Sequence, residues 1–161
     1  MRDRSTSVKR HPVESVAAEG TNVLFDVWLV SKVTHGLLDA ALAPTGLSAD
    51  EFGVYSVLTS AEAMTPSDLA RWMSAPATTV SSYVKRFEAR GHVRRDRNPN
   101  DGRSFVLRMT PAGRRAHRAA GAAFLPVLER VVAALGEGEK SVREALGRLH
   151  HSLDSLAQEQ M

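Results

Sequence analysis

The chain contains no cysteine among its 161 residues. This excludes disulfides, thiolate metal ligands, cysteine nucleophiles and thiol-based redox sensing. Aromatic residues make up only 6% of the sequence, and no run approaches the roughly 18 apolar residues of a membrane span. The first twenty residues carry basic side chains but no apolar run behind them, so we expect no signal peptide and no membrane partner. The composition is compatible with the reducing cytoplasm, where we expect the protein to act.

Patterns that carry catalysis or hold a metal are also missing. The sequence has no Walker loop, no Gly-x-Ser-x-Gly elbow and no His-Glu-x-x-His motif. Of its six histidines only His150 and His151 are adjacent, and neighbouring helical residues diverge by about 100° and chelate poorly together. We therefore expect no enzymatic activity, no metal site and no cofactor.

Positive charge is concentrated in one part of the chain. Residues 85–118 hold eleven basic and three acidic residues, a net charge of +8, which leaves −5 for the rest of a chain whose total is +3. A basic block inside an otherwise acidic protein indicates a polyanionic partner, although charge alone is equally compatible with a solvated basic face. The basic residues of the block are Lys85, Arg86, Arg90, Arg94, Arg95, Arg97, Arg103, Arg108, Arg114, Arg115 and Arg118.

The sequence patterns of residues 48–90 predict a helix-turn-helix. A capping box of Ser48 and Glu51 predicts the start of one short helix, and Thr65 predicts the N-cap of the next. After a brief turn at residues 74–76, a further helix should run to Arg90. Two short helices joined by such a turn are the arrangement that places a recognition helix in DNA.

A β-hairpin is expected directly after this unit. Residues 92–97 and 104–109 are the two strand candidates, and residues 98–102 between them are dense in turn-forming residues. A hairpin in this position is the wing of a winged helix-turn-helix. The predicted fold is thus mainly α with a small β-hairpin wing.

Helices are predicted on both sides of the winged helix. Residues 21–43 repeat apolar residues at helical spacing, and a long helix should begin at Thr110. In the last helix the apolar residues step by four and three positions, a short heptad pattern. The pattern favours a surface shared between two subunits, and the alternative is a helix packed on its own domain. The heptad residues are Val142, Leu146, Leu149, Leu153 and Leu156.

Several of these segments resemble the MarR (multiple antibiotic resistance regulator) family. The resemblance is strong over residues 65–113, and elsewhere it depends on the order of helices alone. A wing ending in Asp-Gly-Arg and followed by Thr-Pro-Ala-Gly is the most specific signal. The matching residues are Leu69-Ala70, Val80, Phe87-Glu88-Ala89-Arg90-Gly91, Val93, Arg95, Asn98-Pro99-Asn100-Asp101-Gly102-Arg103 and Leu107 through Gly113.

The resemblance implies a transcriptional regulator, in most cases a repressor, that binds a pseudo-palindromic operator in double-stranded DNA as a homodimer. It divides the chain into a flexible arm (1–20), a dimerisation helix (21–46), a winged helix-turn-helix domain (47–113) and C-terminal dimerisation helices (114–157). It further implies that a small aromatic effector releases the DNA. The alternative is a winged-helix module for protein–protein contact, which would not need so basic a wing.

The resemblance also assigns site residues. In the recognition helix small hydroxyl side chains replace the long polar residue of many relatives, so base reading should depend more on Arg86, the wing and DNA shape. Arg103 is expected to enter the minor groove, and Asp101 to brace the wing. The expected DNA-binding residues are Thr78, Thr79, Ser81, Ser82, Lys85, Arg86, Arg95, Arg97, Asp101 and Arg103. The expected effector-binding residues, for which an ordinary core role is the alternative, are Trp28, His35, Tyr55 and Trp72.

Overall fold

The computed structural model describes residues 22–159, so the predicted arm of residues 1–20 lies outside the described residues. The chain divides into two compact units, residues 1–35 and residues 36–161. The boundary falls inside the first helix, α1 (Val23–Leu42), so the described part of the first unit is the beginning of that helix. The second unit holds everything from the end of α1 onward and is described below.

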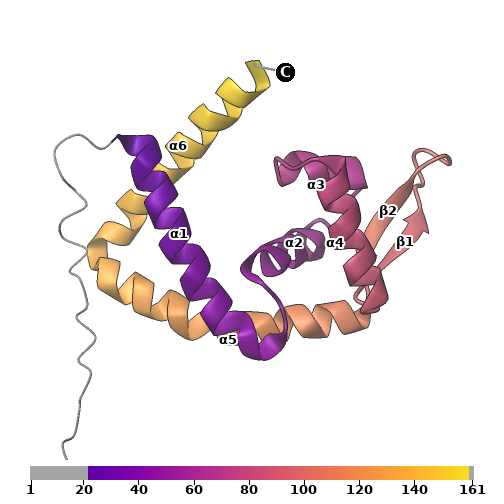
Figure 1. Ribbon diagram of the computed structural model, residues 1–161, viewed down its shortest axis with the longest axis horizontal. Helices are drawn as coiled ribbons and strands as arrows, with labels where there is room; N and C mark the ends of the chain where they lie inside the picture. The colour runs from indigo at the N-terminus through magenta and orange to yellow at the C-terminus, as the bar shows by residue number, and fades with distance from the viewer. Residues whose placement is uncertain (1–21, 160–161) are drawn as a thin grey trace, which may run out of the picture. The chain divides into compact units, whose positions relative to one another are not determined.

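The order of elements confirms a mainly helical fold with one β-hairpin (Figure 1). The helix-turn-helix and the hairpin occupy the middle of the chain, and long helices follow. After α1 the elements are η2 (Ala43–Thr45), α2 (Ala49–Ser60), α3 (Pro66–Trp72), α4 (Ala77–Ala89), β1 (Val93–Arg97), β2 (Phe105–Met109), α5 (Pro111–Leu135), η3 (Gly136–Gly138) and α6 (Glu139–Glu159).

Side-chain caps start three of these helices where the sequence predicted them. The Ser48 hydroxyl accepts the amide of Glu51 at 3.2 Å, and the Glu51 carboxylate accepts the amide of Ser48 at 3.4 Å. Thr65 caps α3 and Thr110 caps α5, each by accepting an amide three residues on at 3.1 Å. These bonds satisfy amides that have no partner within the helix, so the starts of the helices are fixed locally.

The wing is a two-stranded antiparallel sheet. Val93 pairs with Met109 at its base, and Arg97 pairs with Phe105 toward the turn. Both strands begin one residue later than predicted. Met64, in the connection between α2 and α3, adds an antiparallel bridge to Leu107 that the sequence did not indicate. This bridge ties the hairpin to the helix-turn-helix, so the wing has a fixed base.

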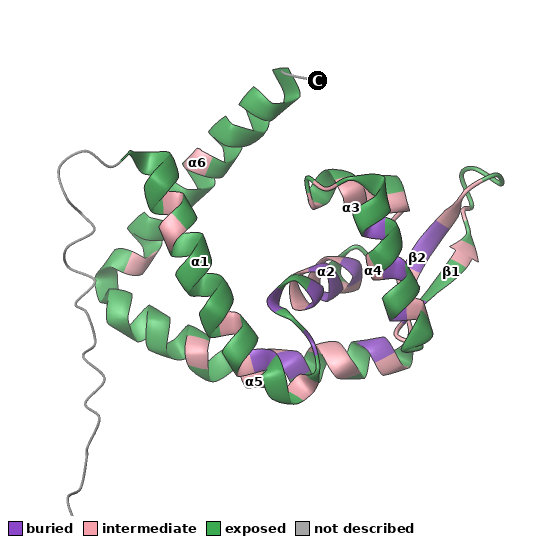
Figure 2. Ribbon diagram, in the orientation of Figure 1, coloured by how far each residue is buried: buried purple, intermediate pink, exposed green. Residues whose placement is uncertain are grey.

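One apolar core holds the winged helix together (Figure 2). It lies among α2, α3, α4, the hairpin and the first half of α5, which contributes Ala120. Its largest fully buried side chains are Tyr55, Phe87, Leu42, Leu58, Leu69, Leu107, Val54 and Val80. Because these residues come from every element of the domain, the recognition helix and the wing share one rigid support.

The rest of α5 and the whole of α6 contrast with this core. Neither has a buried residue beyond Ala120 among those described, and Figure 2 shows α6 exposed along most of its length. The helical segment Pro111–Glu159 is the one described segment that is long and apolar enough to cross a membrane, by length and composition alone. A single such helix is weak support for a membrane span, because a helix that packs on a second subunit has the same composition.

Candidate nucleic-acid interface

Helix α4 presents a continuous polar face to solvent. Its apolar residues Val80, Val84 and Phe87 are buried in the core, which fixes the rotation of the helix about its axis. The opposite face carries the six residues expected to meet DNA, and all of them are exposed. They are Thr78, Thr79, Ser81, Ser82, Lys85 and Arg86.

The turn of the wing is organised by its own side chains. The Asp101 carboxylate accepts the backbone amide of Arg103 at 3.0 Å. Asn98 accepts the amide of Asn100 at 3.0 Å and donates to the Ser104 hydroxyl at 2.8 Å. Arg103 itself is exposed. The arrangement therefore holds the turn in shape while leaving the Arg103 side chain available to a partner.

The two other wing arginines expected at DNA lie differently. Arg95 pairs with Glu88 at 2.8 Å, and its guanidinium lies over the Phe105 ring at 4.5 Å. Arg97 lies against the turn, because a Cβ at Gly102 would be 2.8 Å from its Nη2 atom. Both side chains thus have contacts within the chain, and contact with a phosphate would compete with those contacts.

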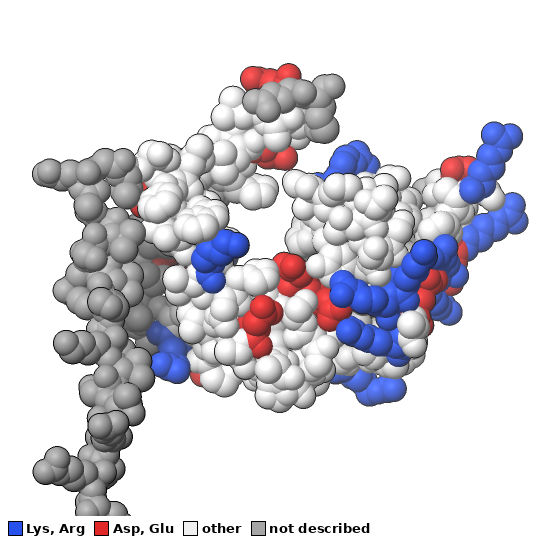
Figure 3. Space-filling model, in the orientation of Figure 1, with Lys and Arg blue, Asp and Glu red and all other residues white. Residues whose placement is uncertain are grey.

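Ion pairs within the chain also reduce the number of unpaired basic side chains in residues 85–118. Asp96 pairs with Arg94 at 3.1 Å and with Arg108 at 3.3 Å on one face of the hairpin. On the face of the molecule shown in Figure 3, basic side chains gather over the winged helix and the wing extends into solvent. In residues 85–118 of the described chain, the basic side chains without an ion pair are Lys85, Arg97, Arg103, Arg114, Arg115 and Arg118.

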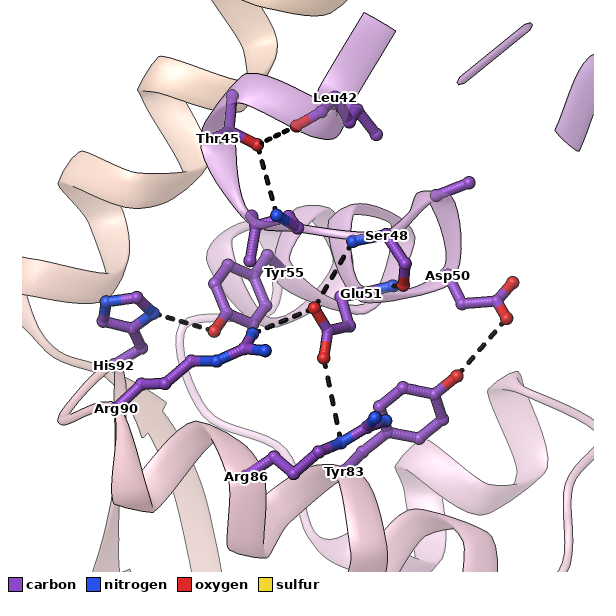
Figure 4. Close-up of polar contacts among 12 residues, drawn as sticks. Leu42, Thr45, Ser48, Asp50, Glu51, Tyr55, Tyr83, Arg86, Arg90 and His92 are labelled. Atoms are coloured by element: carbon purple, nitrogen blue, oxygen red, sulfur yellow. Dashed lines mark hydrogen bonds and ion pairs between the residues drawn. The ribbon is translucent and has the colours of Figure 1, made fainter. Parts of the chain in front are cut away.

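Glu51 is the one buried charged residue of the described chain, with 3% exposure. Its carboxylate pairs with Arg86 of α4 at 3.8 Å and with Arg90, the C-cap residue of α4, at 2.9 Å (Figure 4). The bond to Glu51 raises the pKa of Arg90 above its usual value. The sequence indicated only the capping role of Glu51, because the pairing residues lie more than thirty positions away.

Tyr55 was expected to line an effector pocket, with a core role as the alternative, and in the structure it is a core residue. Its side chain has 0% exposure and packs edge-on against Phe87 at 4.6 Å between ring centroids. Its hydroxyl shares a 2.9 Å hydrogen bond with Nδ1 of His92 at the base of the wing. Burial raises the pKa of Tyr55 and lowers the pKa of His92. Tyr55 is a core residue because an aromatic ring at this helix position faces the recognition helix.

The other expected effector residues are exposed. Trp72 is 53% exposed and lines a groove of about 530 Å³ with small residues of α2. Trp28 and His35 belong to the first compact unit, where Trp28 stacks on Phe25 at 5.8 Å. No group of three or more possible metal ligands occurs in residues 22–159.

Comparisons with known proteins agree with this geometry. Residues 45–104 match the sequence model of the MarR family. An HTH-type transcriptional repressor of Mycobacterium tuberculosis is 30% identical over 125 residues, which cover 75% of this chain and 90% of that protein. Since the matched proteins are transcriptional regulators, a class without enzymatic activity, the prediction that the chain is not an enzyme is confirmed.

Solved structures show the same fold. The M. tuberculosis transcriptional regulator MOSR in complex with DNA has a TM-score of 0.72 at 23% identity, over 84% of this chain and 98% of that chain. A mutant of MarR from E. coli complexed with operator DNA has a TM-score of 0.69 at 20% identity, over 80% of this chain and 97% of that chain. The predicted winged helix-turn-helix fold is therefore confirmed.

Proposed function

This chain belongs to the MarR family of DNA-binding transcriptional regulators, and we propose that it acts in the cytoplasm as a homodimeric repressor of a pseudo-palindromic operator. The observation that carries the proposal is the exposed polar face of α4 beside a cationic wing on one rigid core. A surface of this kind fits the major groove of DNA and the minor groove next to it.

The exposed apolar residues of the C-terminal helices support the homodimer. Such a surface is seldom left uncovered by a soluble protein, and two copies of a heptad pattern cover each other. Pairing also doubles the DNA-binding surface, because two recognition helices can meet half-sites roughly 34–36 Å apart. The residues concerned are Leu125, Leu128, Val131, Val132, Leu135, Val142, Leu146, Leu153 and Leu156.

In this proposal the chemistry of each side chain determines which part of the DNA it contacts. The hydroxyl residues of α4 contact phosphates and thymine methyl groups, and Arg86 supplies a guanidinium able to make two hydrogen bonds to a guanine edge. Arg103 enters the minor groove, while Asp101 keeps the turn in shape through its bond to the Arg103 amide. Arg97 and Lys85 contact the phosphate backbone.

A small aromatic effector is the second part of the proposal. The groove beside Trp72 offers an exposed aromatic surface next to small side chains of α2, which suits a flat apolar ligand. Trp28 and His35 are further candidates on the first compact unit. To release DNA, the effector must bind one arrangement of the dimer better than the other, with a coupling of about 1–3 kcal/mol.

Binding to labelled DNA tests the proposal against the alternative of a protein–protein module. A duplex from upstream of the protein's own gene and a random duplex are compared by fluorescence anisotropy at about 50 and 200 mM salt. A regulator of this kind should prefer the first duplex by about 10³-fold or more and lose affinity for both as salt rises. Equal and weak binding to both duplexes contradicts sequence-specific regulation.

A further inference from the structure

The Glu51 carboxylate lies between two arginines of the recognition helix. One oxygen, Oε2, is 2.9 Å from Nη1 of Arg90 and accepts the Ser48 amide at 3.4 Å. The other oxygen, Oε1, is 3.8 Å from Nε of Arg86. Figure 4 shows the carboxylate at the start of α2, directed toward both guanidinium groups. One buried acid thus contacts α4 at Arg86 and its C-cap at Arg90, a helical turn apart.

The two arginines differ in how accessible their guanidinium groups are to a partner outside the chain. Arg90 uses its terminal nitrogen for the short bond to Glu51, so it anchors α4 to α2. The Nε atom of Arg86 lies 3.8 Å from the carboxylate, and the Arg86 side chain is 54% exposed. Its guanidinium lies over the Tyr83 ring at 4.7 Å, and the Tyr83 hydroxyl donates to Asp50 at 3.3 Å. The half-exposed Arg86 guanidinium is therefore accessible to a partner outside the chain.

We propose that Glu51 is a positioning residue that orients the Arg86 guanidinium toward the operator and restrains it from pairing freely with DNA phosphates. The inference rests on the proposed function, because it assumes that α4 meets DNA. Glu51 in this view contributes to the choice between operator and other DNA and does not touch DNA itself.

The physical basis is that Glu51 and DNA phosphates compete for the guanidinium of Arg86. A phosphate is available to Arg86 on any DNA sequence, whereas two aligned hydrogen bonds to a guanine edge require a defined orientation of the guanidinium. The carboxylate and the Tyr83 ring hold that orientation from two sides. A carboxylate also offsets part of the charge that Arg86 offers to phosphates, which lowers the affinity for random DNA.

The test is the Glu51→Gln variant of the full chain, with labelled operator and random duplexes measured over a range of salt concentrations. Glutamine keeps an oxygen to accept the Ser48 amide but removes the charge. The operator-to-random affinity ratio should fall by about five- to a hundredfold, the discrimination carried by one bidentate contact. The salt slope on random DNA should steepen by about one unit, because Arg86 gains a phosphate.

Combination with Arg86→Ala separates positioning from general structure. In that background Glu51→Gln should change neither the ratio nor the slope, because the side chain that it orients is gone. A lower melting temperature with an unchanged ratio, or the same change of ratio in both backgrounds, overturns the inference. A wild-type chain that binds no DNA would overturn the proposed function itself, and this inference with it.

A second variant covers the case in which Glu51→Gln does not fold. Glu51→Asp keeps the charge but shortens the side chain by one methylene, which withdraws it from Arg86 across the present 3.8 Å. The operator-to-random affinity ratio should again fall, whereas the salt slope on random DNA should change less than in the Glu51→Gln variant. An unchanged ratio in a folded Glu51→Asp protein contradicts the orienting role.

Discussion

The winged helix and the C-terminal helices of the same unit bury their apolar residues in different ways. In the winged helix, three helices, the hairpin and the start of α5 surround one core, and its large apolar side chains are covered by the chain itself. Along the second half of α5 and along α6 the apolar side chains are exposed. The first region buries its large apolar side chains within the single chain, whereas the second leaves an apolar face exposed, and in the proposed homodimer a second copy covers that face.

The comparison teaches that the fold supports two tasks separately. A rigid core presents α4 and the wing at fixed positions, so recognition depends on the side chains of that domain. In the proposed homodimer the long helices set the distance between two such domains. Changes in the first region should alter recognition or stability, and changes in the second should alter assembly.

The largest effect is expected from charges placed on the apolar face of α6. Leu149→Glu or Leu153→Glu puts a carboxylate into the predicted subunit contact, and light scattering should then report one chain mass in place of two. Operator affinity should fall by about 10²–10⁴-fold, because the two DNA-binding domains are no longer linked. His151→Glu, on the opposite face of the helix, is the control and should leave the measured mass and the operator affinity unchanged. A dimer that persists in both leucine variants would refute the assignment of this face.

The next effect concerns the attachment of α5 to the wing. A Cβ at Gly113 would collide with the carbonyl oxygen of His92, so Gly113→Ala should destabilise the domain by about 1–3 kcal/mol in urea unfolding. A Cβ at Gly121 on the same helix meets nothing within 4 Å, and Gly121→Ala should be neutral or stabilising. Equal stabilities of the two variants would mean that the α5 start is not tightly packed.

A smaller effect is expected at the wing tip. Arg103→Ala should lower operator affinity and reduce the salt slope by about one unit, because one cation is lost from the DNA surface. Asp101→Ala should also weaken binding although it removes a negative charge, since the Arg103 amide loses its acceptor. Both are measured by anisotropy over a salt series. Tighter binding by Asp101→Ala would show that charge outweighs bracing.

The smallest effect is a pH dependence of stability. Burial lowers the pKa of His117, a residue of α5 that shares a 3.0 Å hydrogen bond with Ser56 of α2. As the pH falls, the unfolded chain takes up the proton first, so the stability present above the unfolded pKa is lost as pH falls through the folded one. Urea unfolding at about pH 7 and pH 5 should show a smaller loss in His117→Gln than in the wild type. The control His150→Gln, on exposed α6, should behave as the wild type.

Local patterns predicted much of the winged helix. The caps at Ser48, Thr65 and Thr110 use amides three residues away, and the turn at residues 98–102 is set by its own composition. The apolar stripe of α4 likewise gives its buried face from the sequence alone. Such features depend on interactions between residues close together along the chain, so they can be predicted from the sequence.

What the sequence could not predict depends on distant residues. The Glu51 ion pairs to Arg86 and Arg90 and the Met64 bridge to Leu107 require the folded arrangement of separate elements. The wing arginines illustrate the same limit, because Arg95 was expected to contact DNA and is paired with Glu88. The basic residues of a segment therefore do not show which of them are free of ion pairs in the fold.

The mass of the complex between the full chain and its operator duplex tests the central claim most directly. Light scattering of the purified complex, with an operator duplex found by the binding assay, gives the number of chains per duplex. On a duplex that keeps only one half-site of the operator, two winged helices joined through their C-terminal helices predict two wild-type chains per duplex and one chain after Leu149→Glu. A single wild-type chain per duplex, bound as tightly as the Leu149→Glu variant, would contradict the account.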